Sequence, residues 1–268
     1  MDWSVYLLAL GVILSLAVAA WAVSVFARDV SFVDSLWSPF FLLAAVVYAA
    51  SLGTVEDIGS RGLLVLILVA VWSLRLSIYI TARNWGEGED YRYRKIRADN
   101  DPGFWFKSLY IVFLLQGLLA WIISVALLPA VTGGGALNAL DYLALALWLV
   151  GFLFESVGDY QLSRFKAQPG NEGKVMDRGL WRYTRHPNYF GDFCVWWSFY
   201  LFALAAGAWW SVVAPLLMSF LLLKVSGVSM LEKTITDRRP KYADYIARTN
   251  AFFPGPPKSL PAPQGAES

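Results

Sequence analysis

The stretch VYLLALGVILSLAVAAWAVSVF, from Val5 to Phe26, has 22 residues and no Asp, Glu, Lys or Arg. At about 1.5 Å per residue, a helix of this length crosses about 30 Å of hydrocarbon. The rest of the chain shares the bias, since 57% of its 268 residues are hydrophobic and 16% are charged. Soluble domains have about 25% charged residues. The sequence therefore predicts an all-α integral membrane protein without a separate soluble domain.

Six more apolar runs of similar length follow the first. Together they predict seven transmembrane helices, at Val5–Phe26, Val30–Leu52, Leu63–Ala82, Trp105–Leu128, Leu140–Gly158, Tyr189–Ala206 and Trp209–Leu231. Only Gly207 and Ala208 separate the last two spans, which predicts a tight helical hairpin. One membrane domain then covers residues 1–253, and the Pro-rich stretch 254–268 is expected to be a flexible tail.

Most basic residues lie in three segments. Six Lys or Arg lie in Arg83–Lys107, six in Tyr160–Asn188 and six after Glu232, while the connections near Gly133 and Gly207 have none. The positive-inside rule makes these three segments cytoplasmic. With seven spans, the N-terminus is then outside and the C-terminus is cytoplasmic.

Ionisable residues also occur within or at the ends of the predicted spans, where burying a charge is costly. They are Asp34, Arg75, Glu155, Asp159, Asp192 and Lys224. Such residues face a protein interior or a watery cavity, so they indicate a site. The structural alternative is that they pair with one another, for example Asp34 with Arg75, or that Lys224 extends its amine to the membrane surface.

The two large cytoplasmic loops mix cations with aromatic rings. The first reads RNWGEGEDYRYRKIR, from Arg83 to Arg97, and the second contains Lys166, Lys174 and Arg178. Cations bind phosphates and rings stack on bases, so these loops favour a nucleotide. Anionic lipid headgroups are the alternative partner, and nucleic acid is not expected. No metal site is expected either, because the chain has one histidine and one cysteine.

The most specific motif is GLWRYTRHPNYFGD, from Gly179 to Asp192, which leads into the sixth predicted span. It resembles a signature of the steroid 5α-reductase family, including bacterial DUF1295-like members, in a superfamily with membrane sterol reductases and isoprenylcysteine methyltransferases. The resemblance covers about Asp29 to Pro254. It implies a seven-helix reductase of the bacterial inner membrane that holds NADPH in a cytoplasm-facing cavity. Its substrate would be a lipophilic, steroid-like enone taken from the bilayer.

Carried over by position, the resemblance implies a cofactor site around Asn188 and Asp192. The other residues that it implies for this site are Arg83, Asn84, Arg97, Asp159, Tyr160, Lys166, Lys174, Arg178, Arg185, His186, Tyr189, Glu232, Tyr242 and Tyr245. Lys166 and Lys174 stand where the family has arginines near phosphate. This change keeps the charge but loses the bidentate geometry of a guanidinium.

The family's substrate-polarising pair, a glutamate on span two and a tyrosine on span three, is not reproduced. The nearest acid is Asp34, Trp72 stands near the tyrosine position, and Tyr79 is a phenolic substitute further along span three. Enone reduction places negative charge on the carbonyl oxygen as hydride reaches the β carbon, so a hydrogen-bond donor is needed there. Asp34 can donate when it is protonated.

Two other functions remain open on the sequence alone. Membrane methyltransferases that use S-adenosylmethionine have a similar RHPxYxG stretch and a glutamate after the final span, which Glu232 fits. A singly charged sulfonium, however, needs fewer phosphate-binding cations than this chain offers. The second alternative is a noncatalytic protein that binds sterols or other lipids. NADPH-dependent enone reduction is the function that we expect.

Overall fold

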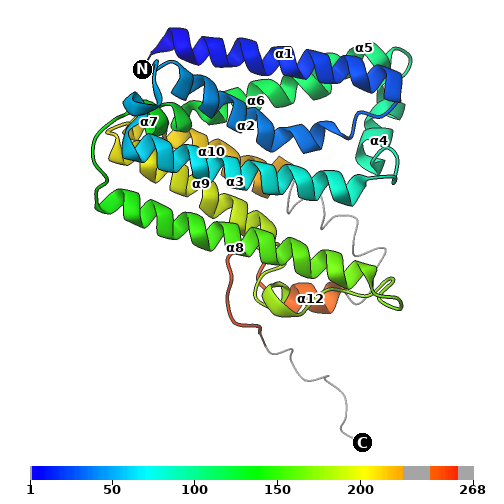
Figure 1. Cartoon of the computed structure of the whole chain (residues 1–268). Helices are drawn as coiled ribbons and strands as arrows, with labels where there is room; N and C mark the ends of the chain where they lie inside the picture. Colours follow the sequence, from blue (N-terminus) through cyan, green and yellow to red (C-terminus); the bar gives the residue numbers. More distant parts are fainter. Residues whose placement is uncertain (1, 226–241, 259–268) are drawn as a thin grey trace, which may run out of the picture. The chain divides into compact units, whose positions relative to one another are not determined.

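The computed structural model describes residues 2–225 and 242–258, and every regular element in them is helical (Figure 1). Within these residues, five helical stretches are long and apolar enough to cross a membrane. They are Trp3–Ala27, Val33–Ala50, Val55–Asn84, Phe104–Thr132 and Ala139–Ala167. A shorter apolar stretch covers Trp209–Val225. The prediction of a multi-pass, all-helical membrane protein is confirmed at this level.

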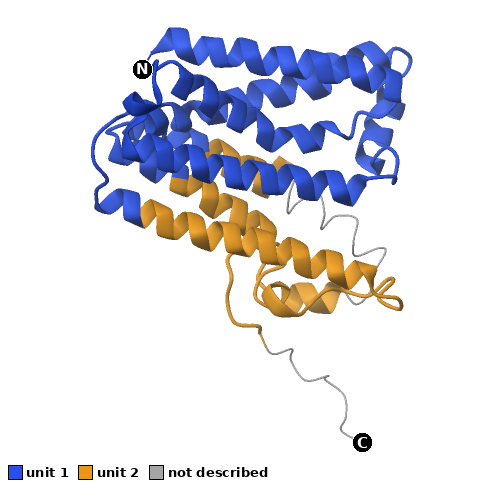
Figure 2. Ribbon diagram, viewed as in Figure 1, with its two compact units in different colours: residues 1–142, 199–214 blue, residues 143–198, 215–268 orange. Residues whose placement is uncertain are grey.

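The chain divides into two compact units (Figure 2). Unit 1 comprises residues 1–142 and 199–214, and unit 2 comprises residues 143–198 and 215–268. Both units contain candidate membrane-spanning helices. A single membrane domain over residues 1–253 therefore stays a prediction.

Unit 1 is formed mainly by the N-terminal half of the chain. Its elements are α1 (Trp3–Ala27), α2 (Val33–Ala50), η1 (Val55–Ile58), α3 (Gly59–Asn84), α4 (Tyr91–Asn100), α5 (Phe104–Ser108), η2 (Leu109–Leu114), α6 (Leu115–Ile123), η3 (Ser124–Ala126), α7 (Leu127–Thr132) and η5 (Trp209–Val212). α2 packs along α3 and α1. The fully buried ring of Trp72 on α3 lies 5.9 Å from that of Phe41 on α2, measured between ring centroids.

One end of α3 is held by a buried ion pair. Arg61 donates to both carboxylate oxygens of Asp141, at 2.7 and 2.9 Å, and to the carbonyl oxygens of Gly134 and Ala136. Asp141 lies in the first turn of α8 (Ala139–Ala167), in the part of that helix that belongs to unit 1. This pair therefore ties the start of α8 and the loop before it to α3.

Unit 2 contains most of α8 and of α9 (Pro187–Ala205). The other elements are η4 (Gly179–Arg182), part of α10 (Val213–Phe220), η6 (Leu221–Val225) and α12 (Tyr242–Arg248). α8 and α9 approach closely because both have glycine at the crossing. A Cβ added to Gly191 would lie 2.4 Å from the Glu155 amide nitrogen and 2.5 Å from the Gly151 carbonyl oxygen.

The predicted spans match the helices with shifted ends. The predicted fifth span, for example, ends at Gly158, but α8 continues to Ala167. The predicted hairpin is present, because the chain turns at Gly207, where φ is +84°, and Trp197 of α9 donates to the hydroxyl of Ser219 of α10. The seventh predicted span is described only to Val225.

The start of the predicted tail is anchored in unit 2. Gly255 donates its N–H to the carbonyl oxygen of Tyr183 at 3.0 Å, and Lys258 donates its N–H to that of Arg248 at 2.8 Å. The remainder of the predicted tail, residues 259–268, lies outside the described residues.

Candidate functional site

A polar network in unit 1 surrounds Asp34, in the first turn of α2. Arg92 donates to its Oδ2 at 2.7 Å, and the Tyr93 hydroxyl donates to its Oδ1 at 2.6 Å. Gln116 of α6 donates to the same hydroxyl oxygen at 3.0 Å. The structural alternative from the sequence paired Asp34 with Arg75, but the guanidinium of Arg75 lies over the ring of Tyr79. Both Asp34 oxygens accept hydrogen bonds, which favours an acceptor rather than the predicted proton donor.

The network also sets the ionisation states of Tyr93 and Asp90. Burial, and then the charge of Asp34, raise the pKa of the Tyr93 phenol well above its usual range, so the hydroxyl keeps its proton at neutral pH. Burial alone would raise the pKa of Asp90, but hydrogen bonds from Arg92 lower it below 3.8. The result is a neutral phenol beside fixed charges.

Two predicted catalytic residues have other surroundings. Trp72 is completely buried, and its ring contacts those of Phe41 and Phe199 at 5.9 and 6.3 Å, so it is part of the aromatic core of unit 1. The ring of Tyr79 lies under two guanidinium groups, at 5.3 Å from that of Arg75 and 5.8 Å from that of Arg83. The phenol that the structure places on Asp34 is Tyr93, not Tyr79.

Two arginines predicted to lie at the cofactor site, Arg97 and Arg83, interact with other side chains. Arg97 forms a two-pronged ion pair with Glu89, at 2.7 and 2.9 Å, and lies 4.5 Å over the ring of Phe104. Its guanidinium thus has a structural role, and its predicted place in the cofactor site stays a prediction. Arg83 donates to the side-chain oxygen of Asn84 at 3.1 Å, and Asn84 Nδ2 is buried without a hydrogen-bond acceptor in the described part of the chain.

In unit 2, the close crossing of α8 and α9 gathers polar side chains. Asn188 Nδ2 donates to Asp159 Oδ1 at 3.1 Å, and the ring of His186 stacks on that of Tyr189 at 5.6 Å. Four polar side chains of this region are buried, each at most 8% exposed: Glu155, Asp159, His186 and Asp192. These four residues, with Asn188 and Tyr189, are named here the Asp159 cluster. The structure therefore joins Asp159 to Asn188 and His186 to Tyr189, four residues of the predicted cofactor set.

Other residues of the same motif secure the C-terminal segment. Arg185 is 7% exposed, and its Nη1 donates to the carbonyl oxygens of Ile246 and Thr249. The buried Tyr245 hydroxyl donates to the carbonyl oxygen of Trp181, and its ring contacts that of Tyr242. These contacts hold α12 against the motif, so Arg185 and Tyr245 act as tethers, and their predicted role at the cofactor site stays a prediction.

The other residues predicted for the cofactor site lie at the surface or outside the described residues. Tyr160 is 59% exposed, and its hydroxyl oxygen accepts from Arg164 at 2.8 Å. Lys166, Lys174 and Arg178 are exposed. Glu232 lies outside the described residues. Within the described residues, no three His, Cys, Asp or Glu side chains are grouped so that they could hold a metal ion.

Arg92, Tyr93 and Gln116 were not predicted as site residues. Arg92 and Tyr93 lie in the first basic loop, where their ring and charge suggested a nucleotide surface. Gln116 did carry a usable signal, because it is an isolated amide within an apolar span. The six-residue π-helix η2 immediately precedes its helix, and such irregular turns are frequent at functional sites.

Comparison with known proteins gives a family but no activity. The chain is 28% identical over 263 residues to an uncharacterized protein of Schizosaccharomyces pombe, C594.04c, covering 87% of this chain and 75% of that protein. No solved structure matches. The profile of a protein family of unknown function, DUF1295, matches residues 20–249, which include the Asp34 network and the Asp159 cluster. The chain therefore belongs to the DUF1295 family.

Proposed function

We propose that this protein reduces the carbon–carbon double bond of a lipophilic enone, such as a 3-oxo-Δ4-steroid, with NADPH. The observation that carries the proposal is the Asp159 cluster, which gathers the resemblance-derived residues Asp159, Asn188 and Asp192. Buried charges within membrane helices are costly, and they generally mark a ligand or proton pathway. Their arrangement supports a cofactor site better than a purely structural role.

The cluster contains donors and acceptors of the kind that bind NADPH, which supports the proposal. The Asn188 amide and the Asp159 carboxylate offer a donor and acceptors for a carboxamide or for ribose hydroxyl groups. Lys166 and Lys174 provide exposed positive charge in the segment between them. NADPH differs from NADH by a 2′-phosphate, so Lys174→Ala is expected to weaken NADPH binding more than NADH binding. Equal losses of affinity for both would contradict this assignment.

In the proposed reaction, Tyr93 is the donor for the substrate oxygen. When bound, NADPH supplies the hydride that the β carbon of the enone accepts. The Tyr93 hydroxyl turns its hydrogen from Asp34 toward the carbonyl oxygen, where negative charge grows. Arg92 and Gln116 keep Asp34 and the phenol oxygen in place. The α carbon then takes a proton from water, which completes the reduction.

The proposal also includes the membrane topology. We infer seven spans with the N-terminus outside, because α9 is 19 residues long and an apolar helix follows it from Trp209. The three basic segments then lie in the cytoplasm. The bacterial inner membrane stays a prediction, since the relative described above is from a yeast.

The test uses the full-length protein purified in detergent. Binding of NADPH, NADH and S-adenosylmethionine is measured, followed by NADPH oxidation with progesterone, a 3-oxo-Δ4-steroid. We expect NADPH binding that Asn188→Ala removes and that the control Asn100→Ala, in α4, retains. Tight binding of S-adenosylmethionine without binding of NADPH would replace this proposal with the methyltransferase alternative.

A further inference from the structure

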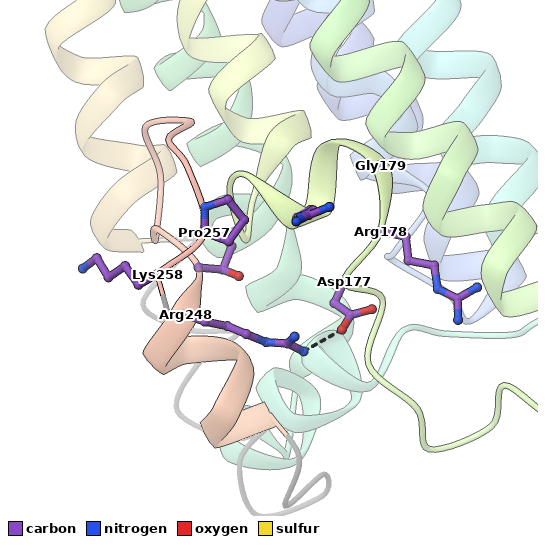
Figure 3. Close-up of a pocket in the computed structure, with 8 residues that line it drawn as sticks. Asp177, Arg178, Gly179, Arg248, Pro257 and Lys258 are labelled. Carbon is purple, nitrogen blue, oxygen red and sulfur yellow. Dashed lines mark hydrogen bonds and ion pairs between the residues drawn. The ribbon is translucent and has the colours of Figure 1, made fainter. Parts of the chain in front are cut away.

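A pocket of about 580 Å³ lies within unit 2. Residues 177–182 form one wall and residues 248–258 form the other (Figure 3). No residue of the Asp159 cluster lines it. Ligand pockets have volumes of about 300–1,000 Å³, so this one is large enough for a small charged group.

The lining of this pocket is strongly basic. It has four cationic side chains, Arg178, Arg182, Arg248 and Lys258, and one acidic side chain, Asp177. Asp177 accepts from Arg248 Nη2 at 2.6 Å, as Figure 3 shows. That ion pair neutralises one cation and leaves three lining charges in excess. Such an excess in a concave site attracts anions.

Hydrogen-bonding capacity in the pocket is also unused. Arg248 Nε is buried and has no acceptor in the described part of the chain, although Asp177 fixes the other end of the same guanidinium. Arg178, Arg182 and Lys258 are exposed. Guanidinium groups and an ammonium group match the oxygens of a phosphate, and charge-assisted bonds of this kind are the strong ones.

The walls are held in place without any ligand. The two chain segments are joined by the hydrogen bonds from Gly255 to Tyr183 and from Arg185 to Thr249. The buried Tyr245 hydroxyl adds a third link, to Trp181. The backbone of the pocket is therefore fixed, and binding needs only the ordering of long side chains at the rim.

Exposed aromatic residues lie close in sequence to the residues that line the pocket. Tyr183, which directly follows Arg182, is 45% exposed, and Phe253, between Thr249 and Pro257, is 61% exposed. Aromatic rings are enriched where a membrane protein meets the headgroup layer. The phosphate can thus belong to a lipid headgroup or to a soluble ester.

We infer that this pocket binds the phosphate group of an anionic ligand, through Arg178, Arg182, Arg248 and Lys258. This inference does not rest on the proposed reductase activity, although Arg178 is also a candidate for the cofactor site. The binding strength depends on Arg178, Arg182 and Lys258, whose side chains have no partner among the described residues, while the Asp177–Arg248 pair sets the position of the Arg248 guanidinium.

The experiment measures thermal unfolding of the full-length protein in an uncharged detergent. Inorganic phosphate, dioctanoyl phosphatidic acid and zwitterionic dioctanoyl phosphatidylcholine are titrated separately. The pocket variant is Arg182→Gln with Lys258→Gln, which leaves Arg178 intact because it is also a cofactor-binding candidate. The control variant, Arg94→Gln with Lys95→Gln, removes the same charge from exposed positions on α4.

We expect phosphatidic acid to stabilise the wild type and the control, with a half-saturating concentration at least about tenfold higher in the pocket variant. Stabilisation by phosphatidic acid alone assigns the site to a lipid headgroup. Stabilisation by inorganic phosphate as well assigns it to phosphate itself. If the wild type shows no response, or if the pocket variant responds like the control, the inference is wrong.

Discussion

At the residue scale, the hydroxyl of Tyr93 both donates and accepts a hydrogen bond within unit 1. It donates to Asp34 and accepts from Gln116, while Arg92 binds the other Asp34 oxygen. Such a network leaves the phenol neutral, oriented and largely buried. These are the properties needed to donate to a developing oxyanion.

Tyr93→Phe should therefore remove the donor without removing the ring. We expect turnover of the enone to fall by a factor on the order of 10² to 10⁴, with NADPH affinity unchanged. Steady-state kinetics and a cofactor titration separate the two effects. Tyr142→Phe, at an exposed position, is the matched control. Normal turnover in Tyr93→Phe would exclude the phenol from the reaction.

Asp90 makes the stability of the same loop dependent on pH. Its pKa is lower in the folded protein than its ordinary value of 3.8, despite burial, because Arg92 binds it. The stabilisation is therefore fully present above about pH 4 and is lost as pH falls through the folded-state pKa. Thermal unfolding followed from pH 6 to pH 2 should show this loss, and Asp90→Asn should show a shallower dependence. Identical pH profiles would contradict the assignment.

At the element scale, the crossing of α8 and α9 depends on glycine. Gly151 and Gly191 leave space for each helix backbone to approach the other, which sets Asp159 beside Asn188. The sequence predicted both helices and the motif between them. It could not predict the crossing, because a helix contact depends on which faces meet and not on local hydropathy.

Gly191→Ala should force these helices apart. The added methyl group would lie within 2.4 Å of the Glu155 amide nitrogen, so we expect a loss of about 1–3 kcal/mol in stability together with weaker NADPH binding. Gly11→Ala is the control, since a Cβ there has no neighbour within 4 Å. Equal unfolding temperatures for the two variants would show that the crossing tolerates a side chain.

At the scale of the whole molecule, the membrane architecture could be predicted from the sequence, but the long-range ion pairs could not. Apolar length and charge predicted the helical membrane architecture, because both are properties of contiguous sequence. The ion pairs Asp34–Arg92 and Arg61–Asp141 join residues 58 and 80 positions apart, and nothing local predicts such partners. The motif Gly179–Asp192 contains Asn188, which the structure joins to Asp159, but it did not reveal that Arg185 secures α12.

The proposed topology places three separate basic segments on one side of the membrane. Single cysteines at Arg94, Lys174 and Lys258, in a Cys194→Ala background, should react with an impermeant thiol reagent from the same side. A cysteine at Val55, which is 75% exposed between α2 and α3, should react from the other side. Opposite labelling of any one basic position would exclude the seven-span arrangement.

The two members of the Arg61–Asp141 pair are synthesised at different times. Arg61 leaves the ribosome 80 residues before its carboxylate partner. At about 5–20 residues per second, the cation waits about 4–16 s before neutralisation becomes possible. During that interval α3 carries an unmatched charge near one end, so the insertion machinery, the membrane surface or water must accommodate it. Unit 1 acquires its final electrostatic balance only after the first turn of α8 has been made.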